Sequence, residues 1–323
     1  MSAAADGGVS RRVTLVMNPT SGRGRIVRFG LVEAAERAGA RVLMTGPDRD
    51  AGTLARAALQ DGADVLGAAG GDGTVSAVAA VAAVARRPLV VVPAGTRNHF
   101  ARDLGLDIHH PLAALDALAD AESARVDLGA ANGRTFVNNV SLGMYAEALL
   151  NPHYRQGRAR AMASVAGPYL DGRHWVDATV SAPGGTLERP QVVLISNNPY
   201  HVATPQNLGR RFALDGAVLG AIVVRRSAGP TPPPPPRLMR AQTLGPGADD
   251  GLVRWSAPRV VVEGAASTVA AGVDGEAVNL GLPLTCTTMP GALHVLLPRD
   301  RPGVPPEPAP PKPPGLSHED APR

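Results

Sequence analysis

The chain has 323 residues and a formal net charge of +4, and 3% of its residues are aromatic. This length is enough for two ordinary domains with a sizeable core. The modest charge, the lack of a long basic block and the few aromatic side chains argue against a dedicated nucleic-acid-binding protein. Cys286 is the one cysteine, which excludes both a disulfide framework and a cysteine-based metal site.

Lysine is almost missing from the sequence, since the one lysine, Lys312, lies near the C-terminus. A phosphate-binding site in the folded part must therefore use backbone N–H groups, arginines or a metal ion. A Walker A loop, a Schiff-base lysine and the lysine of protein kinases are excluded. The longest apolar stretch, residues 75–85, is shorter than the about 20 residues that span a bilayer, and the N-terminus lacks the order of a signal peptide. We therefore expect a cytoplasmic protein.

The first third of the chain alternates apolar runs typical of buried strands with segments of helical spacing. The strands are expected at residues 12–17, 41–44, 64–69 and 89–92, and the helices at residues 26–38, 50–61 and 75–85. Because short links join these elements, we expect a parallel sheet that is covered on both faces. Residues 10–128 are thus predicted to form a Rossmann-like α/β nucleotide-binding domain.

The remainder of the chain has a different pattern, in which short β-like runs are separated by glycine, proline and asparagine. This pattern predicts an antiparallel β-sandwich domain over residues 129–298, interrupted by a helical segment at 145–170. The polyproline stretch 229–237 is interpreted as an exposed loop, with a proline-recognition ligand as the alternative. Residues 299–323 are rich in proline and hold too few large apolar side chains to fold, so we expect a disordered tail.

Three glycine-rich loops follow strands of the first domain: "NPTSGRGR", "GGDGT" and "PAGTRNHF". Their glycines allow positive φ angles and close approach of the backbone, and the helices that follow direct free N–H groups at the turns. Such a turn binds phosphate, and Asp72 within "GGDGT" would serve a metal ion bound to that phosphate. Each loop alone could be an ordinary tight turn. Together, at the carboxyl ends of strands in one sheet, they predict a nucleotide-binding crevice.

These loops closely resemble the catalytic domain of diacylglycerol kinases, in the branch that contains bacterial soluble lipid kinases, ceramide kinases and sphingosine kinases. The likeness continues through "FVNNVSLG", "VVLISNNPY", "FALDGAVLG" and "VDGEAV", and it covers residues 12–298. "GGDGT" by itself also resembles turns of NAD kinases and phosphofructokinases. Its combination with the late "VDGE" is more specific.

The resemblance implies ATP and Mg²⁺ as cofactors, together with a set of nucleotide contacts. The residues that match the nucleotide-binding motifs are Asn18, Ser21, Gly22, Thr45, Gly70, Gly71, Asp72, Gly73, Thr74, Gly95 and Thr96. Asp274 resembles the base that accepts the proton of the lipid hydroxyl, and Glu276 is its acidic neighbour. Asp215 resembles a ligand of a second, structural Mg²⁺, with the backbone carbonyls of Phe212 and Ala217. The alternative for both Asp-Gly pairs, at Asp215 and Asp274, is an ordinary hairpin turn.

The sequence departs from the family pattern at two places near the phosphate loops. His99 stands where most members have aspartate, and Ser76-Ala77 stands where many have asparagine and glutamate. A neutral imidazole does not replace a carboxylate as a ligand of Mg²⁺. We interpret these changes as marks of a subgroup.

The leading hypothesis is therefore an ATP-dependent lipid kinase that phosphorylates diacylglycerol or a related lipid at a membrane surface. Arg155, Arg158 and Arg160 could dock it on anionic lipid, although a solvated helix face explains them equally well. Two alternatives stay open: a kinase of a soluble acceptor, as in NAD kinases, and a catalytically silent nucleotide-binding regulatory protein. No nucleic-acid partner is expected, and a homodimer is left open.

Overall fold

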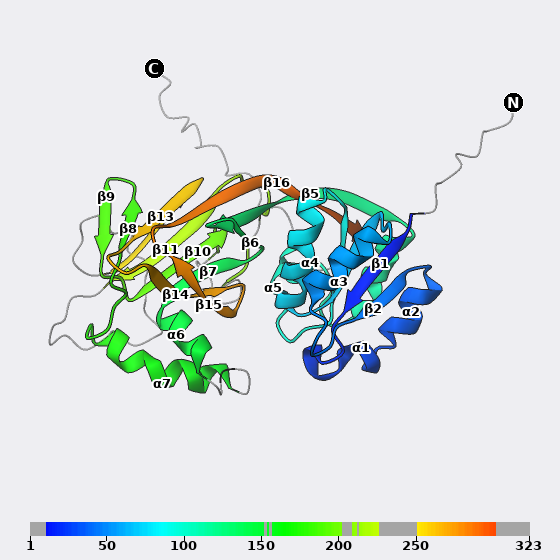
Figure 1. The fold of residues 1–323 in the computed structure, drawn as a ribbon, viewed down its shortest axis with the longest axis horizontal. Helices are drawn as coiled ribbons and strands as arrows, with labels where there is room; N and C mark the ends of the chain where they lie inside the picture. Colours follow the sequence, from blue (N-terminus) through cyan, green and yellow to red (C-terminus); the bar gives the residue numbers. More distant parts are fainter. Residues whose placement is uncertain are drawn as a thin grey trace, which may run out of the picture.

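The computed structural model describes residues 11–151, 154, 157–201, 209–211, 213–225 and 251–301. Figure 1 shows two lobes that are connected by two long strands, β5 (Ala121–Ala131) and β16 (Leu284–Pro298). Four sequence predictions fall wholly or partly outside the described residues. These are the polyproline stretch, the lipid-docking role of Arg155 and of the Arg158 side chain, the metal-binding role of Phe212, and the disorder of the tail beyond residue 301.

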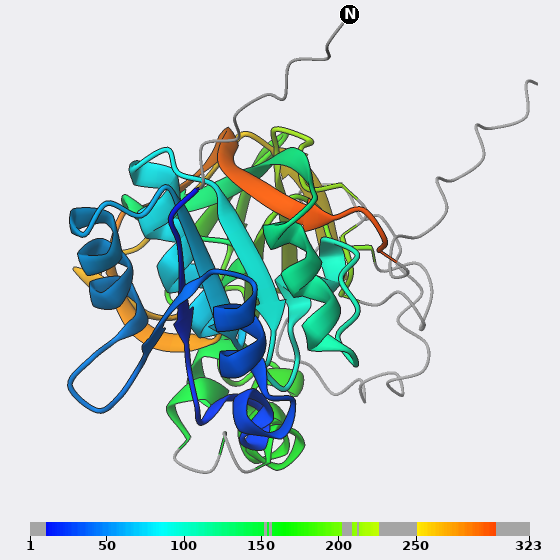
Figure 2. The ribbon, with the colours of Figure 1, turned by 90° about the vertical axis from the view of Figure 1, so that its right-hand side faces the viewer.

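The first lobe is a parallel sheet with helices on both faces, which confirms the predicted α/β class. Its strands follow the order β2-β1-β3-β4, and Figure 2 shows helices on both sides of them. The strands are β1 (Val13–Met17), β2 (Arg41–Met44), β3 (Val65–Gly70) and β4 (Leu89–Pro93). The helices are η1 (Ser21–Arg23), α1 (Arg25–Arg28), α2 (Leu31–Arg37), α3 (Ala51–Gln60), α4 (Asp72–Val84), α5 (His99–Asp103) and η2 (Pro111–Leu118).

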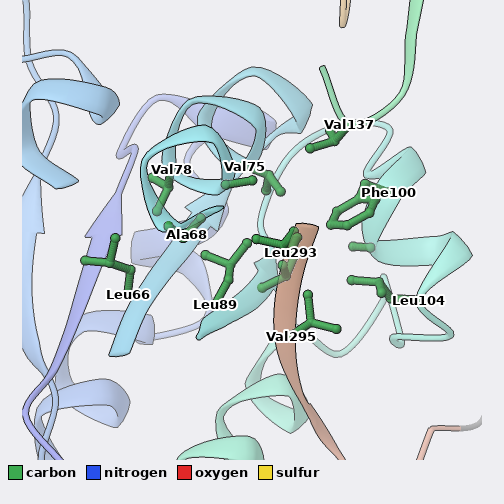
Figure 3. Close-up of a cluster of buried hydrophobic side chains, with 14 of the residues drawn as sticks. Leu66, Ala68, Val75, Val78, Leu89, Phe100, Leu104, Val137, Leu293 and Val295 are labelled. Atoms are coloured by element: carbon green, nitrogen blue, oxygen red, sulfur yellow. The ribbon is translucent and has the colours of Figure 1, made fainter. Parts of the chain in front are cut away.

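The strand β3 is buried on both of its sides. Leu66 and Ala68 pack against α4 in one apolar cluster (Figure 3), whereas Val65 and Ala69 belong to a second cluster with α1 and α2. Successive side chains of a strand point to opposite faces of the sheet. The small and β-branched residues of β3 therefore let helices approach from both directions, and every residue of the strand is buried.

Two helical segments differ from their predictions. The single helix expected at residues 26–38 is the pair α1 and α2, because Gly30 between them has a φ of 59°, which ends the first helix and starts the second. The helical segment expected at residues 145–170 is likewise the pair α6 (Met144–Leu150) and α7 (Arg158–Leu170). Helical spacing identified both regions but did not locate the breaks.

The second lobe contains a six-stranded antiparallel sheet in the order β12-β11-β10-β7-β14-β15. It packs through a buried apolar cluster against β8, β13 and the first part of β16, as the predicted sandwich requires. The strands of this lobe are β6 (Arg134–Phe136), β7 (Asn139–Gly143), β8 (Thr179–Ala182), β9 (Gly185–Glu188), β10 (Val192–Asn197), β11 (Leu219–Arg225), β12 (Gly251–Ala257), β13 (Arg259–Glu263), β14 (Thr268–Val273) and β15 (Glu276–Gly281).

One sheet continues from the first lobe into the second. Strand β16 pairs in parallel with β4 at its C-terminal end, pairs with β13 at its N-terminal end, and runs antiparallel to β5 along most of its length. The boundary expected between residues 128 and 129 falls inside β5, so the limits of the two domains stay a prediction. Hydrogen-bonded strands, rather than a loose linker, set how the lobes face each other.

Candidate active site

The three glycine-rich loops come together at the carboxyl ends of β1, β3 and β4. The backbone N–H of Gly71 donates to the hydroxyl of Ser21 at 3.3 Å. A Cβ atom on Gly95 would lie 2.2 Å from the Cα of Gly71, and one on Gly22 would lie 2.4 Å from the carbonyl oxygen of Ala94. Only residues without side chains permit these approaches, so the loops form one continuous backbone surface.

The other predicted nucleotide contacts lie on the same edge. The side-chain amide of Asn18 reaches the hydroxyl of Thr74 at 3.5 Å. The N–H of Thr45 donates to the carbonyl of Met17 at 2.9 Å, which places it beside the end of β1. Thr96 is exposed in the third loop. A Cβ atom on Gly70 would lie 2.6 Å from the hydroxyl oxygen of Thr74, so the start of α4 also packs closely on its strand.

Asp72 opens helix α4 and is held as a carboxylate. Its Oδ1 accepts hydrogen bonds from the N–H of Phe100 at 3.3 Å and from the side-chain amide of Asn138 at 3.4 Å. Its Oδ2 lies 3.4 Å from Nδ1 of His99. Burial alone would raise the pKa of Asp72, but His99 and the two hydrogen bonds outweigh it, and the pKa lies below its ordinary value.

Asp274 occupies the turn between β14 and β15 with its side chain directed inward. Asp274 and Gly275 have φ angles of 50° and 86°, the positive values of an Asp-Gly hairpin turn. The hairpin turn named as the alternative is therefore present, and the role of Asp274 as a base stays a prediction. Asp274 is 9% exposed, and burial raises the pKa of its carboxyl against the lowering effect of its hydrogen bonds.

Four donors hold the carboxylate of Asp274. Three are backbone N–H groups: Val137 donates to Oδ2 at 2.8 Å, and Asn138 and Asn139 donate to Oδ1 at 2.7 and 3.0 Å. The fourth is the hydroxyl of Ser76 on α4, which donates to Oδ2. The backbone donors are rigid, whereas the hydroxyl can rotate.

The two carboxylates therefore belong to one hydrogen-bonded assembly. Asn138 contacts Asp72 with its side chain and Asp274 with its backbone. A cavity of about 180 Å³ opens beside this assembly. Its lining consists of Gly73, Ser76, Ala77, Ala80, Arg134, Thr135, Val273, Asp274 and Glu276.

Glu276 lies at the mouth of this cavity, between the two lobes. Its Oε2 accepts from Arg134 at 3.3 Å, and its Oε1 lies 3.1 Å from the position of a Cβ atom on Gly73. This carboxylate of the second lobe therefore lies against the start of α4 in the first. The turn between β14 and β15 brings Glu276 next to the glycine-rich loop at the start of α4.

Both predicted Mg²⁺ sites stay untested. No group of three or more histidine, cysteine, aspartate or glutamate side chains converges within the described ranges. Mg²⁺ in kinases needs only one or two carboxylates besides phosphate oxygens and water, and the start of α4 offers Asp72, with Glu276 lying against Gly73. Asp215 is exposed, and the N–H of Ala217 donates to the buried Asp127 at 2.7 Å. The structural Mg²⁺ site stays a prediction.

Sequence reasoning misses two residues that organise the site. Asn138 lies inside "FVNNVSLG" without an assigned role, and Arg211, which donates to its side chain, is not singled out. Ser76 is a departure from the family pattern, yet its hydroxyl contacts Asp274. The available signal is the position of polar residues after apolar ones in "FVNN", which by itself does not identify their partners.

A family model and several known proteins match the sequence. The family described as "Diacylglycerol kinase catalytic domain" matches residues 12–131. A protein of Pseudomonas aeruginosa (strain UCBPP-PA14) named "Probable lipid kinase YegS-like" is 31% identical over 305 residues, which are 90% of this chain and 96% of that protein. A "Diacylglycerol kinase" of Mycobacterium tuberculosis (strain ATCC 25618 / H37Rv) is 38% identical over 122 residues, 36% of this chain and 40% of that protein.

Solved structures show the same fold. The crystal structure of a diacylglycerol kinase from Bacillus anthracis str. Sterne superposes with a TM-score of 0.58 at 18% identity, covering 89% of this chain and 97% of that chain. A second structure from the same organism superposes with a TM-score of 0.63 at 19% identity over the same shares. At such identities the likeness concerns the fold alone.

Proposed function

Because the chain belongs to the diacylglycerol kinase catalytic-domain family, we propose that it transfers the γ-phosphate of ATP to the hydroxyl of a lipid. The observation that carries the proposal is the link through Asn138 between Asp72 at the phosphate loops and Asp274 in the second lobe. Phosphoryl transfer depends mostly on positioning and charge neutralisation. On this proposal, the acceptor hydroxyl and the γ-phosphate would meet between these two carboxylates.

The glycine loops support ATP as the donor. Their backbones converge within contact distance, and α4 directs its first N–H groups toward the same edge. The nearby cations are arginines, such as Arg25, whose guanidinium donates to the carbonyls of Gly95 and Ile108. The triphosphate would thus be bound by backbone donors and arginines, because this part of the sequence has no lysine.

Asp72 and Glu276 would hold Mg²⁺ with the nucleotide. When bound, the ion would neutralise charge on the β- and γ-phosphates during transfer. Asp72 is suited to this role because its lowered pKa keeps it ionised at neutral pH. His99, which stands where most members of the family have an aspartate, lies beside Oδ2 of Asp72. The first lobe would therefore offer the ion the carboxylate of Asp72 and no second one from the position of His99.

Asp274 would accept the proton of the acceptor hydroxyl. Of its four named donors, the Ser76 hydroxyl is the one that can rotate away from Oδ2, and both residues line the cavity. We expect the acceptor hydroxyl to take that place. A raised pKa makes the carboxylate a stronger base than an exposed aspartate, which general-base catalysis favours.

A second cavity supports a lipid as the acceptor. It has a volume of about 300 Å³ and lies between α6, α7 and β14, with apolar lining residues that include Ala146, Leu150 and Val269. The strand β14 leads from this cavity to Asp274, and four residues of strand span about 13 Å. A lipid could therefore place its hydroxyl at the base and an acyl chain in this cavity.

Contact with the membrane would be peripheral. Within the described ranges, no helix combines the length and apolar character that a crossing of the bilayer needs. Leu150 lies at the cavity and is 59% exposed, and the exposed Arg160 on α7 belongs to the same helical pair. An apolar side chain with a cation nearby suits a surface of anionic lipid.

The test is incubation of the protein with γ-labelled ATP, Mg²⁺ and a panel of diacylglycerol, a sphingoid base, phosphatidylglycerol, a prenol and NAD, resolved by chromatography. Label in a lipid that disappears when Mg²⁺ is chelated supports the proposal. Label in NAD alone would replace it with a kinase of a soluble acceptor. Binding of ATP without transfer to any acceptor would indicate a silent nucleotide-binding protein.

A further inference from the structure

Arg211 is a buried cation at the junction of the two lobes. Its side chain and that of Asp103 on α5 are both fully buried, and Nε of Arg211 lies 2.7 Å from Oδ2 of Asp103. A buried ion pair costs desolvation energy, and the loss of one partner leaves an unpaired charge. This pair joins the helix after the third nucleotide loop to the segment that precedes β11 in the second lobe.

The remaining donors of Arg211 reach the segment before β7 and the end of β10. Nη1 donates to the carbonyl of Val137 at 2.6 Å and to that of Asn197 at 2.9 Å, and Nη2 donates to Oδ1 of Asn138 at 2.7 Å. The side chain of Val137 is fully buried in the apolar cluster of the first lobe, close to Phe100 (Figure 3). Asn138 is thus anchored from both lobes.

This anchoring decides which way the amide of Asn138 points. Because a guanidinium only donates, the amide oxygen must face Arg211 and the NH₂ group must face Oδ1 of Asp72. The backbone N–H of the same residue donates to Asp274. One residue therefore sets the placement of both carboxylates, while the partner that orients it lies outside the cavity.

We propose that Asn138, oriented by the Arg211–Asp103 ion pair, is a positioning residue that keeps the metal-binding Asp72 and the base Asp274 in register across the two lobes. This inference rests on the proposed function, because it assigns Asn138 a task in phosphoryl transfer. A misplacement of about 1 Å in such a site can cost about 10²-fold in rate. The buried pair thus acts on catalysis without contacting substrate.

Two substitutions of Asn138 separate its contacts. Asn138→Ala removes the contacts to Arg211 and to Asp72, whereas Asn138→Asp keeps an oxygen for Arg211 and replaces the NH₂ donor to Asp72 with a carboxylate oxygen, which repels it. A positioning role predicts that both lower kcat for diacylglycerol in mixed micelles by about 10²-fold, while the affinity for ATP measured without Mg²⁺ stays within about threefold of wild type. A purely structural role predicts that Asn138→Asp restores wild-type turnover together with thermal stability.

Tyr200→Phe is the matched control in the same buried region. The hydroxyl of Tyr200 accepts from the side chain of Asn139 at 2.9 Å, and its ring lies 5.7 Å from the Arg211 guanidinium. Its loss should leave kcat within threefold of wild type. Arg211→Lys should lower kcat like the Asn138 variants, because one ammonium cannot reach Asp103 and the Asn138 amide with the geometry of a guanidinium.

Binding measurements separate failure of this inference from failure of the proposed function. If the wild-type protein phosphorylates no lipid, the proposed function fails, and calorimetry of ATP binding with and without Mg²⁺ still tests the role of Asn138. Asn138→Ala and Asn138→Asp should then change the gain in ATP affinity on adding Mg²⁺ by at least about threefold, and Tyr200→Phe should not. Turnover or Mg²⁺-dependent binding of Asn138→Asp equal to that of wild type would overturn the inference.

Discussion

The hydroxyl of Ser76 donates a hydrogen bond to the carboxylate of Asp274, which lies 198 positions later in the chain. Ser76 belongs to the first turns of α4, directly after the phosphate loop, and Asp274 belongs to a hairpin turn of the second lobe. This contact connects the first lobe to the second across the cavity of about 180 Å³. It also affects how strongly Asp274 holds a proton.

Replacement of Ser76 by alanine should move the acidic limb of the pH profile to higher pH. The hydrogen bond from Ser76 lowers the pKa of Asp274, so its loss raises that pKa further. A base must be deprotonated to act, and a higher pKa means that activity falls at a higher pH during acidification. The measurement is kcat/KM for diacylglycerol against pH, with Ser76→Thr as the variant that keeps a hydroxyl. An unshifted limb would show that Asp274 is not the group that titrates.

Replacement of Asp274 by asparagine should remove most turnover and leave nucleotide binding in place. A general base contributes about 10²–10⁴-fold, and asparagine cannot accept the proton. The affinity for ATP should stay within about threefold of wild type, since the glycine loops lie in the other lobe. Glu263→Gln, at an exposed position of β13, serves as a control for the change of charge. Near-full turnover by Asp274→Asn would contradict the assignment of the base.

Replacement of Gly95 by alanine should weaken ATP binding. The new Cβ atom would lie 2.2 Å from the Cα of Gly71, so the two loops must separate. Overpacking of this kind costs about 1–3 kcal/mol, and we expect the KM for ATP to rise about tenfold, where tenfold corresponds to about 1.4 kcal/mol. Gly167→Ala on α7 is the control, because no atom lies within 4 Å of its Cβ position. Equal KM values for the two variants would show that the loop contact does not shape the site.

Replacement of Ala270 by tryptophan should impair the lipid and spare the nucleotide. Ala270 is an exposed position of β14 that lines the cavity of about 300 Å³, so a large side chain can fill that cavity without disturbing the core. We expect the KM for a long-chain diacylglycerol to rise about tenfold, a loss of about 1.4 kcal/mol, while the KM for ATP is unchanged. Thr186→Trp, at an exposed position of β9, controls for an added surface tryptophan. An unchanged lipid KM would place the acyl chain elsewhere.

The elements that the sequence predicted well are those whose signals are local. The alternating strands and helices of the first lobe follow from short-range hydrophobic spacing, and the phosphate loops follow from glycine next to a strand. The break at Gly30 escaped the helical pattern because one glycine inside an apolar period is also compatible with a continuous helix. The return of β16 to pair with β4 depends on strand pairing over long range, which no local pattern encodes.

By itself, the sequence determined the class of the protein and the identity of Asp72 and Asp274 as the carboxylates to examine, since spacing and family motifs are properties of the chain. Only the tertiary structure decided that Ser76 and Asn138 contact those carboxylates, that Arg211 contacts Asn138, and that Glu276 lies against the start of α4. The physical reason is that a hydrogen bond between distant segments forms only when donor and acceptor lie at the right distance and angle. The packing of the two lobes sets these distances and angles, and the residues adjacent in sequence do not.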